Sequence, residues 1–190
     1  MDTRESLIET TRALLWERGY VGTSPKAIQQ RSGAGQGSMY HHFAGKRDLA
    51  LAAITRTGEE LRAAAEAQFT APGSAYDRIE AYLRRERPVL RGCPVGRLTQ
   101  DPDVMADPEL RAPVEATLAA VRVALARVLD EGRAAGEFDD RLDSPAVAAA
   151  IVATLQGGYV LARAAGDEGP FDDAVGGILT LLHTHRKGTA

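Results

Sequence analysis

The feature that most constrains the fold is an apolar pattern with steps of three and four residues, interrupted by glycine and proline. In the first segment Leu7, Ile8, Leu14 and Leu15 recur at this spacing, with Thr11 adding its methyl group, which gives a helix one buried stripe. No segment alternates apolar and polar residues as a half-buried strand does. The chain is rich in Ala, Leu, Arg and Glu and only 5% aromatic, a composition that favours helix. We therefore predict an all-α protein with about nine helices and short connections.

The breaks predict where the helices begin and end. Ser24 and Ser144 each precede a proline, as N-caps often do. Gly19 and Gly33 can each end a helix, and Pro113 is expected to kink the helix that contains it. The predicted helices cover residues 3–18, 24–33, 36–42, 46–69, 74–89, 95–105, 107–135, 145–164 and 171–185.

Charge is distributed unevenly along the chain. Residues 1–50 hold seven Lys/Arg and five Asp/Glu, whereas the rest is acidic and the whole chain carries a net charge of −3. The mildly basic N-terminal quarter hints at an anionic partner there. With no run of ~18 apolar residues and no signal peptide, we expect a cytoplasmic, nucleoid-associated protein without a membrane partner.

The sequence offers little to an enzyme. The single cysteine, Cys93, excludes an internal disulfide framework. The histidines occur as the pairs 41/42 and 183/185, a spacing that does not place two metal ligands on one helix face. We therefore predict no metal, no cofactor and no enzymatic activity.

Residues 24–42 have the pattern of a helix-turn-helix, with two short helices around a glycine-containing turn. Ile28 can pack the first helix, and Gly33 can adopt a positive φ in the turn. The second helix starts where recognition helices meet base edges, and glutamine can pair with adenine. The candidate DNA contacts are Ser24, Lys26, Gln36, Gly37, Ser38, Tyr40, His41 and Lys46.

A plain helical hairpin would use some of the same residues differently. Tyr40 and Phe43 could both be core aromatics, and we expect Phe43 to be one. We assign His42 a structural role and expect His41 to face outward. A helical adaptor that binds another protein through this hairpin stays open as an alternative.

The segment TSPKAIQQRSGAGQGSMYHHFAGKRDLA, residues 23–50, resembles the DNA-binding signature of the TetR family of repressors. The positions that carry the resemblance are Thr23-Ser24, Ile28, Gly33, Gly37-Ser38-Met39-Tyr40, His42-Phe43 and Lys46. Gly35 departs from it, because the family often has a serine there to cap the recognition helix. GCPVGRLTQDPD (92–103), GEFDD (136–140) and LQGGYVLARA (155–164) are similar to the LmrA/YxaF-like branch.

This resemblance implies a DNA-binding domain over residues 1–45 and a regulatory domain over residues 46–190 for ligand binding and dimerisation. The implied pocket would be lined by Leu61, Phe69, Ile79, Tyr82, Leu83, Gln100, Met105, Leu118, Val121, Leu155 and Tyr159. The last two helices are apolar on more than one face, which favours a dimer interface. Its candidate residues are Val147, Ile151, Leu155, Gly158, Phe171, Val175, Ile178 and Leu182.

Together these features predict a ligand-responsive transcriptional regulator that acts as a repressor. It would bind a palindromic double-stranded DNA operator as a homodimer, and a small hydrophobic or aromatic effector would release it. One further alternative is a redox-sensing regulator based on Cys93, which has no histidine or second cysteine near it in sequence.

Overall fold

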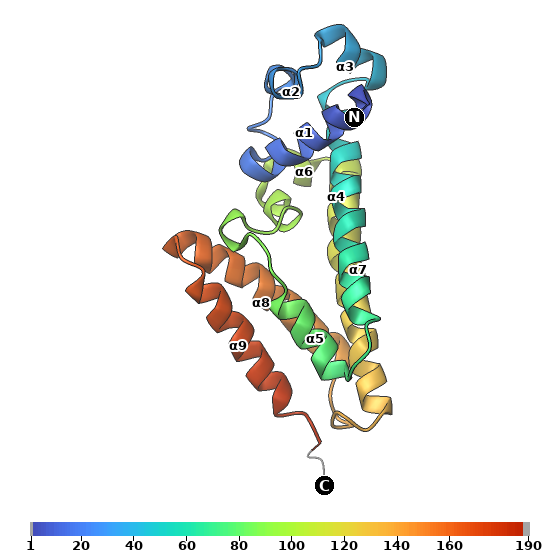
Figure 1. Cartoon of the computed structure of the whole chain (residues 1–190), viewed down its shortest axis with the longest axis vertical. Coiled ribbons are helices and arrows are strands. Elements are labelled where there is room, and N and C mark those ends of the chain that lie inside the picture. Colours follow the sequence, from blue (N-terminus) through green and yellow to red (C-terminus); the bar gives the residue numbers. More distant parts are fainter. Residues whose placement is uncertain (1, 188–190) are drawn as a thin grey trace. The chain divides into compact units, whose positions relative to one another are not determined.

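The computed structural model describes residues 2–187, and the elements of regular secondary structure in this part of the chain are helices joined by turns and loops (Figure 1). The only pairing of extended backbone in these residues is an isolated bridge between Phe138 and Arg186. The α-helices are α1 (Thr3–Arg18), α2 (Pro25–Ser32), α3 (Gln36–His42), α4 (Lys46–Phe69), α5 (Ala75–Arg84), α6 (Pro102–Ala106), α7 (Pro108–Ala134), α8 (Ser144–Ala165) and α9 (Gly169–His183). Two short 3-10 helices, η1 (Val89–Arg91) and η2 (Gly96–Gln100), lie between α5 and α6.

The helix ends follow the local signals in the sequence. Gly19 and Gly33 end α1 and α2 with φ values of 73° and 71°, and glycine reaches this region at little cost. The Ser24 side chain accepts a hydrogen bond from the Ala27 N–H at 3.1 Å, which caps α2. Helix α7 continues through Pro113.

Two predicted helices differ from the structure. The helix expected over residues 74–89 ends at Arg84, and Arg85 has extended ψ; Pro88 follows closely, and the residue before a proline avoids helical geometry. The helix expected over residues 95–105 is divided into η2 and α6. The division falls at Asp101, which caps α6, with Pro102 at its first position.

The chain forms two compact units. Unit 1 comprises residues up to 61 together with 93–117, and unit 2 comprises residues 62–92 together with those from 118 onward. Helices α4 and α7 each contribute to both units. Unit 1 therefore holds α1 to α3 and also η2 and α6, which lie far from them in sequence.

Each unit has its own apolar core. Unit 1 buries the predicted stripe of α1, and its core cluster consists of Leu7, Ile8, Leu14, Ile28, Met39, Phe43 and Leu49. Unit 2 is built on α5, α8, α9 and parts of α4 and α7, and its aromatic rings include Phe69 and Tyr82 with centroids 4.7 Å apart. Phe43 is 4% exposed, as expected for a core residue.

Helix α8 carries more apolar surface than the rest of the chain covers. Among the described residues it is the one helix long and apolar enough to cross a membrane by length and composition, a test that core helices of soluble proteins also pass. Only 28% of its apolar window is buried within the chain. Much of its apolar surface therefore faces outward.

Candidate DNA-binding surface

Helices α2 and α3 are fixed on α1 by a few buried side chains. Ile28 from α2 and Met39 from α3 are both 0% exposed, and they pack with Leu7 and Ile8 of α1. The left-handed backbone of Gly33 reverses the chain between the two short helices. These contacts form the helix-turn-helix that the sequence predicts.

The opposite side of α3 carries polar side chains to solvent. Gln36 and His41 are exposed, Tyr40 is 49% exposed and Ser38 is half-buried. The His42 ring is half-buried and lies 5.0 Å from the His41 ring, edge to face. Helix α3 therefore separates an anchoring side from a side that can meet a partner.

Two glycines at the start of α3 shape this surface. Gly35 is the N-cap and provides no side-chain cap, as its departure from the family pattern implies. A Cβ added at Gly37 would meet no atom within 4 Å. Close packing against α2 therefore does not explain Gly37, and a close approach to an outside partner stays a prediction.

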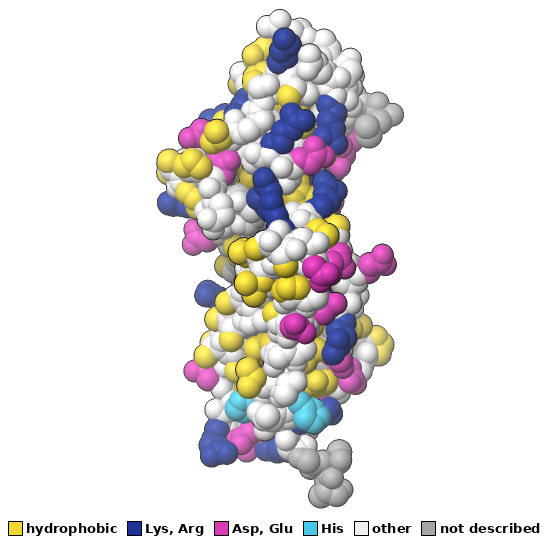
Figure 2. Space-filling view, turned by 90° about the vertical axis from the view of Figure 1, so that its left-hand side faces the viewer, with side chains coloured by type: hydrophobic (Ala, Val, Ile, Leu, Met, Phe, Trp, Pro, Cys, Tyr) yellow, Lys and Arg dark blue, Asp and Glu magenta, His cyan; other side chains and the backbone are white. Residues whose placement is uncertain are grey.

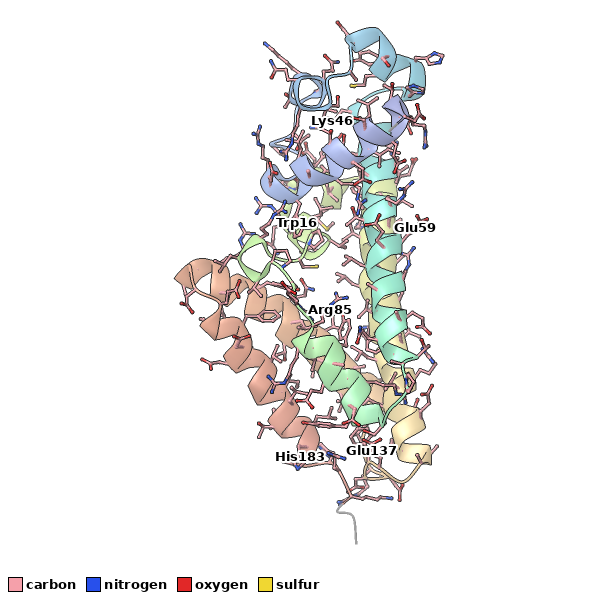
Figure 3. The ribbon with its side chains drawn as sticks, in the orientation of Figure 1. Trp16, Lys46, Glu59, Arg85, Glu137 and His183 are labelled. Atoms are coloured by element: carbon pink, nitrogen blue, oxygen red, sulfur yellow. The ribbon has the colours of Figure 1, made fainter. Side chains whose placement is uncertain are left out.

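Lys46 is held differently from a free surface lysine. Its Nζ lies 3.8 Å from the centroid of the Tyr20 ring, a cation–π arrangement. Burial lowers the pKa of Lys46, although Asp101 and Asp103 act in the opposite direction. Figure 3 shows Lys46 at the start of α4, close to α1. Lys26, in contrast, is exposed on α2.

Ion pairs within unit 1 neutralise part of its positive charge. They join Arg12 to Glu9 and Glu60, Arg31 to Glu17, and Arg47 to Asp107 and Glu109. Hydrogen bonding to these two carboxylates raises the pKa of Arg47, and the same bond to Arg47 lowers the pKa of Asp107. The excess of Lys and Arg over Asp and Glu in residues 1–50 is therefore partly neutralised by carboxylates of the same unit.

Arg4 is a candidate contact that the sequence did not single out. It is exposed in the first turn of α1, and its guanidinium carbon lies 5.4 Å from the centroid of the Phe43 ring. Phe43 is the residue that ends α3, so a cation sits beside the end of the candidate recognition helix. Only the fold brings these two residues together.

The predicted ligand-binding residues are divided between the two units. Leu61, Gln100 and Met105 belong to unit 1, and Gln100 is exposed. The other predicted residues belong to unit 2, where most are core.

One cavity of unit 2, of about 320 Å³, is lined by Arg62, Ala63, Ala65, Glu66, Ala120, Val121 and Ala124. A second, of about 350 Å³, is lined by Leu83, Arg84, Arg85, Glu86, Arg87, Val89, Glu168, Phe171, Asp172 and Val175.

Two arginines lie next to Tyr82 and Tyr159, the predicted pocket residues of unit 2 that carry a hydroxyl group. Arg87 donates a hydrogen bond to the Tyr159 hydroxyl at 3.3 Å and to the Leu83 carbonyl at 3.0 Å. The Arg85 guanidinium carbon lies 4.9 Å from the centroid of the Tyr82 ring. The family resemblance implied the tyrosines as pocket residues but gave no reason to pair them with these arginines.

Most residues predicted for dimer contact are buried by their own chain. Those buried are Ile151, Leu155, Gly158, Phe171, Val175 and Leu182, while Val147 and Ile178 are half-buried against the same core. A Cβ on Gly158 would lie 3.0 Å from the Phe171 ring, so this small residue serves the packing of α8 on α9 within the chain. The buried residues are therefore assigned to the core of unit 2 and not to a dimer interface. A helical period in the sequence identifies an apolar stripe but not the element that covers it.

Other apolar residues on these helices do face outward. Val160 and Leu161 of α8 are 66% and 56% exposed, and Leu181 of α9 is 63% exposed. On the face of unit 2 that carries histidines, Figure 2 shows hydrophobic side chains at the surface between charged ones.

Within the described residues no group of three or more His, Cys, Asp and Glu is arranged to hold a metal ion. Cys93 is half-buried, and its Sγ accepts a hydrogen bond from the Gly96 N–H at 3.2 Å.

Comparison with known proteins places this arrangement in a family. Residues 7–53 match the family described as bacterial regulatory proteins, tetR family, and residues 73–178 match the tetracyclin repressor-like C-terminal domain. The transcriptional regulator YxaF of Bacillus subtilis (strain 168) is 27% identical over 176 residues, or 89% of each chain. LmrA of the same organism is 30% identical over 114 residues, covering 56% of this chain and 61% of its own length.

The fold agrees with the family match. A TetR transcriptional regulator from Chloroflexus aurantiacus J-10-FL, known from a crystal structure, is 28% identical, with a TM-score of 0.87 over 97% of this chain and 96% of its own. The C-terminal match alone spans more than half of the 190 residues. The chain therefore belongs to the TetR family of helix-turn-helix transcriptional regulators, which are DNA-binding proteins and not enzymes.

Proposed function

We propose that the chain is a ligand-responsive repressor that binds a palindromic operator as a homodimer and leaves it when a small effector binds. The observation that carries this proposal is the two-sided character of α3. Met39 anchors the helix with 0% exposure, whereas Gln36, Tyr40 and His41 are exposed on it. A helix held from one side and polar on the other suits the major groove of DNA.

The residues divide into base contacts and backbone contacts. Gln36 and Ser38 lie at the N-terminal end of α3 and are placed to read base edges, and Gly37 lets the backbone approach. Tyr40 and His41 supply hydrogen bonds to phosphate. From outside α3, Ser24, Lys26 and Lys46 complete the phosphate contacts, Lys46 after leaving the Tyr20 ring.

The dimer would form through the outward faces of α8 and α9. Val160, Leu161 and Leu181 are more than half exposed, and a second copy would cover them. The low burial of the apolar window of α8 supports the same interface. Two-fold symmetry then presents two copies of α3 about 34–36 Å apart, or at a related larger spacing.

Effector binding can weaken operator binding only if the effector prefers a state with a different placement of α3. Helix α4 is the proposed lever, because it belongs to both units. The division into a DNA-binding domain over 1–45 and a regulatory domain over 46–190 is part of this proposal. The mostly apolar core of unit 2 favours a hydrophobic or aromatic effector.

Two other functions remain as competitors. A protein-binding adaptor would use the same exposed side of α3 without any need for DNA. A redox-sensing regulator would use Cys93, whose Sγ accepts a hydrogen bond from the Gly96 N–H.

Selection of bound sequences from random double-stranded DNA tests the main proposal. We expect enrichment of one palindrome, and an affinity for it that falls steeply with added salt because phosphate binding releases counterions. No enriched sequence at low ionic strength would refute the repressor and favour the adaptor. Operator binding that peroxide abolishes in the wild type and spares in Cys93→Ser would instead favour the redox sensor.

A further inference from the structure

One carboxylate in unit 1 joins segments that lie about eighty residues apart in sequence. The Asp101 side chain is at the start of α6, and the residue is 8% exposed. Its Oδ2 accepts hydrogen bonds from the backbone N–H groups of Tyr20 at 2.6 Å and Val21 at 3.0 Å. Its Oδ1 accepts from the N–H groups of Asp103 at 3.2 Å and Val104 at 3.3 Å. Each oxygen thus serves a different segment of unit 1.

The turn between α1 and α2 is built to receive this carboxylate. Gly19 has a φ of 73°, and a Cβ at Gly19 would lie 2.8 Å from Asp101 Oδ2, so a side chain there would displace the carboxylate. The buried Thr23 hydroxyl donates to the Gly19 carbonyl at 2.6 Å and fixes the other side of the turn. The ring of Tyr20 lies under Lys46 Nζ, which brings the start of α4 to the same turn.

We propose that Asp101 is a positioning residue for operator binding: its carboxylate ties the turn before α2 to the start of α6 and so couples α6 to the placement of α2 and α3 on DNA. This inference rests on the proposed function. The turn leads directly into Ser24, the N-cap of α2. A more mobile turn would therefore make the orientation of α2 and α3 more variable. Because Oδ1 caps α6, a rearrangement of α6 reaches the turn through the same side chain.

The sharpest perturbation is Asp101→Asn, which keeps the shape of the side chain. An amide can accept through its oxygen toward only one of the two N–H pairs, and its NH₂ group would face the other pair as a donor. The matched control is Asp103→Asn, two residues away on α6. It removes the same charge, and like Asp101 it acts electrostatically on Lys46, but its side chain is exposed and accepts no hydrogen bond from the turn among the described residues.

Two measurements are made on the full chain with the operator that the wild type selects. We expect Asp101→Asn to bind this operator about tenfold more weakly, the equivalent of one hydrogen bond to a charged group, with an unchanged salt slope because no phosphate contact is removed. Hydrogen–deuterium exchange should become faster at the Tyr20 and Val21 amides and stay unchanged in unit 2. Asp103→Asn, which also removes a carboxylate that acts on Lys46, should leave the exchange of both amides unchanged, and its operator affinity is the value with which Asp101→Asn is compared.

A double-mutant cycle tests the coupling of α6. Val104 is 0% exposed, so Val104→Ala loosens α6 locally. We expect it to weaken operator binding in the wild type and to add little in the Asp101→Asn background. Equal effects in both backgrounds, or no effect in the wild type, would overturn the coupling.

The remaining outcomes are also decisive. Operator affinity of Asp101→Asn within about twofold of the Asp103→Asn value, less than a single hydrogen bond contributes, would overturn the inference alone. Faster exchange throughout the chain would assign Asp101 to general stability and overturn it as well. A wild type that selects no DNA sequence would overturn the proposed function and, with it, this inference.

Discussion

Replacing Gly132 by alanine should increase helix propensity but crowd the side chains packed around this position. Gly132 lies inside α7, where alanine is favoured over glycine by about 1 kcal/mol. The added Cβ, however, would lie 2.6 Å from two ring carbons of Phe138 and 2.7 Å from the Cβ of Ala75. Carbon atoms in contact are normally about 3.5–4.0 Å apart. Phe138 or Ala75 therefore has to move by roughly an ångström.

Neither neighbour is free to move. Phe138 is 0% exposed and Ala75 is 3% exposed. The Glu137 carboxylate accepts hydrogen bonds from the N–H groups of Ala75 at 2.8 Å and Tyr76 at 2.9 Å, which fastens the start of α5 to the loop after α7. Figure 3 shows Glu137 at this position. Overpacking of a filled site costs about 1–3 kcal/mol, so at the middle of that range we expect a net loss of about 1 kcal/mol once the gain in propensity is subtracted.

Thermal unfolding at one fixed protein concentration measures the effect, since the apparent stability of a dimer depends on concentration. For a chain of this size the melting temperature should fall by about 2–4 °C for each kcal/mol. Ala64→Gly is the control, because Ala64 is an exposed position within α4, where the change reports helix propensity without a packing clash. It should lower the melting temperature only by the amount that corresponds to the propensity difference of about 1 kcal/mol. Gly132→Ala melting at or above the wild type would refute the packing argument.

Three other predictions concern charge, pH and assembly. Lys26→Ala should weaken binding to all DNA sequences alike and reduce the salt slope by about one, whereas Gln36→Ala should change the base preference in a repeated selection. The hydrogen bond from Arg47 lowers the pKa of Asp107 in the folded protein below its ordinary value of 3.8. The Arg47–Asp107 pair therefore stabilises the fold above pH 3.8, and this stabilisation is lost as the pH falls through the lower pKa of the folded state. In Arg47→Gln, acid unfolding should lack the loss of stability that comes from this pair. Leu161→Glu, on the exposed face of α8, should shift sedimentation toward a monomer while leaving the helical circular dichroism intact.

Local signals in the sequence were sufficient for most of the fold. Pro25 after Ser24, and Gly33 eight residues later, mark α2 because capping and left-handed glycine are properties of a few consecutive residues. The periodic stripe of α1 and the anchoring role of Ile28 follow from helical geometry alone. These features were predicted correctly because no distant contact overrides them.

The errors occur where distant contacts decide the outcome. Leu155 and Phe171 have the period of an interface, yet the chain covers them with its own helices. Asp101 was read as part of a helix, whereas it caps α6 and reaches the backbone of Tyr20 and Val21. Arg4 became a candidate only through its position over the Phe43 ring. Sequence spacing carries no information on contacts between residues this far apart.

The internal ion pairs bear on how an acidic chain can recognise DNA. Arg12, Arg31 and Arg47 pair with carboxylates of their own unit, and Lys46 rests on the Tyr20 ring. Cations used internally give less of the sequence-independent attraction to phosphate that dominates non-specific binding. Base contacts from α3 are unaffected by this loss, since they depend on hydrogen-bonding side chains. If α3 reads DNA as proposed, the ion pairs lower affinity for bulk DNA more than affinity for the operator, and so raise the ratio on which regulation depends.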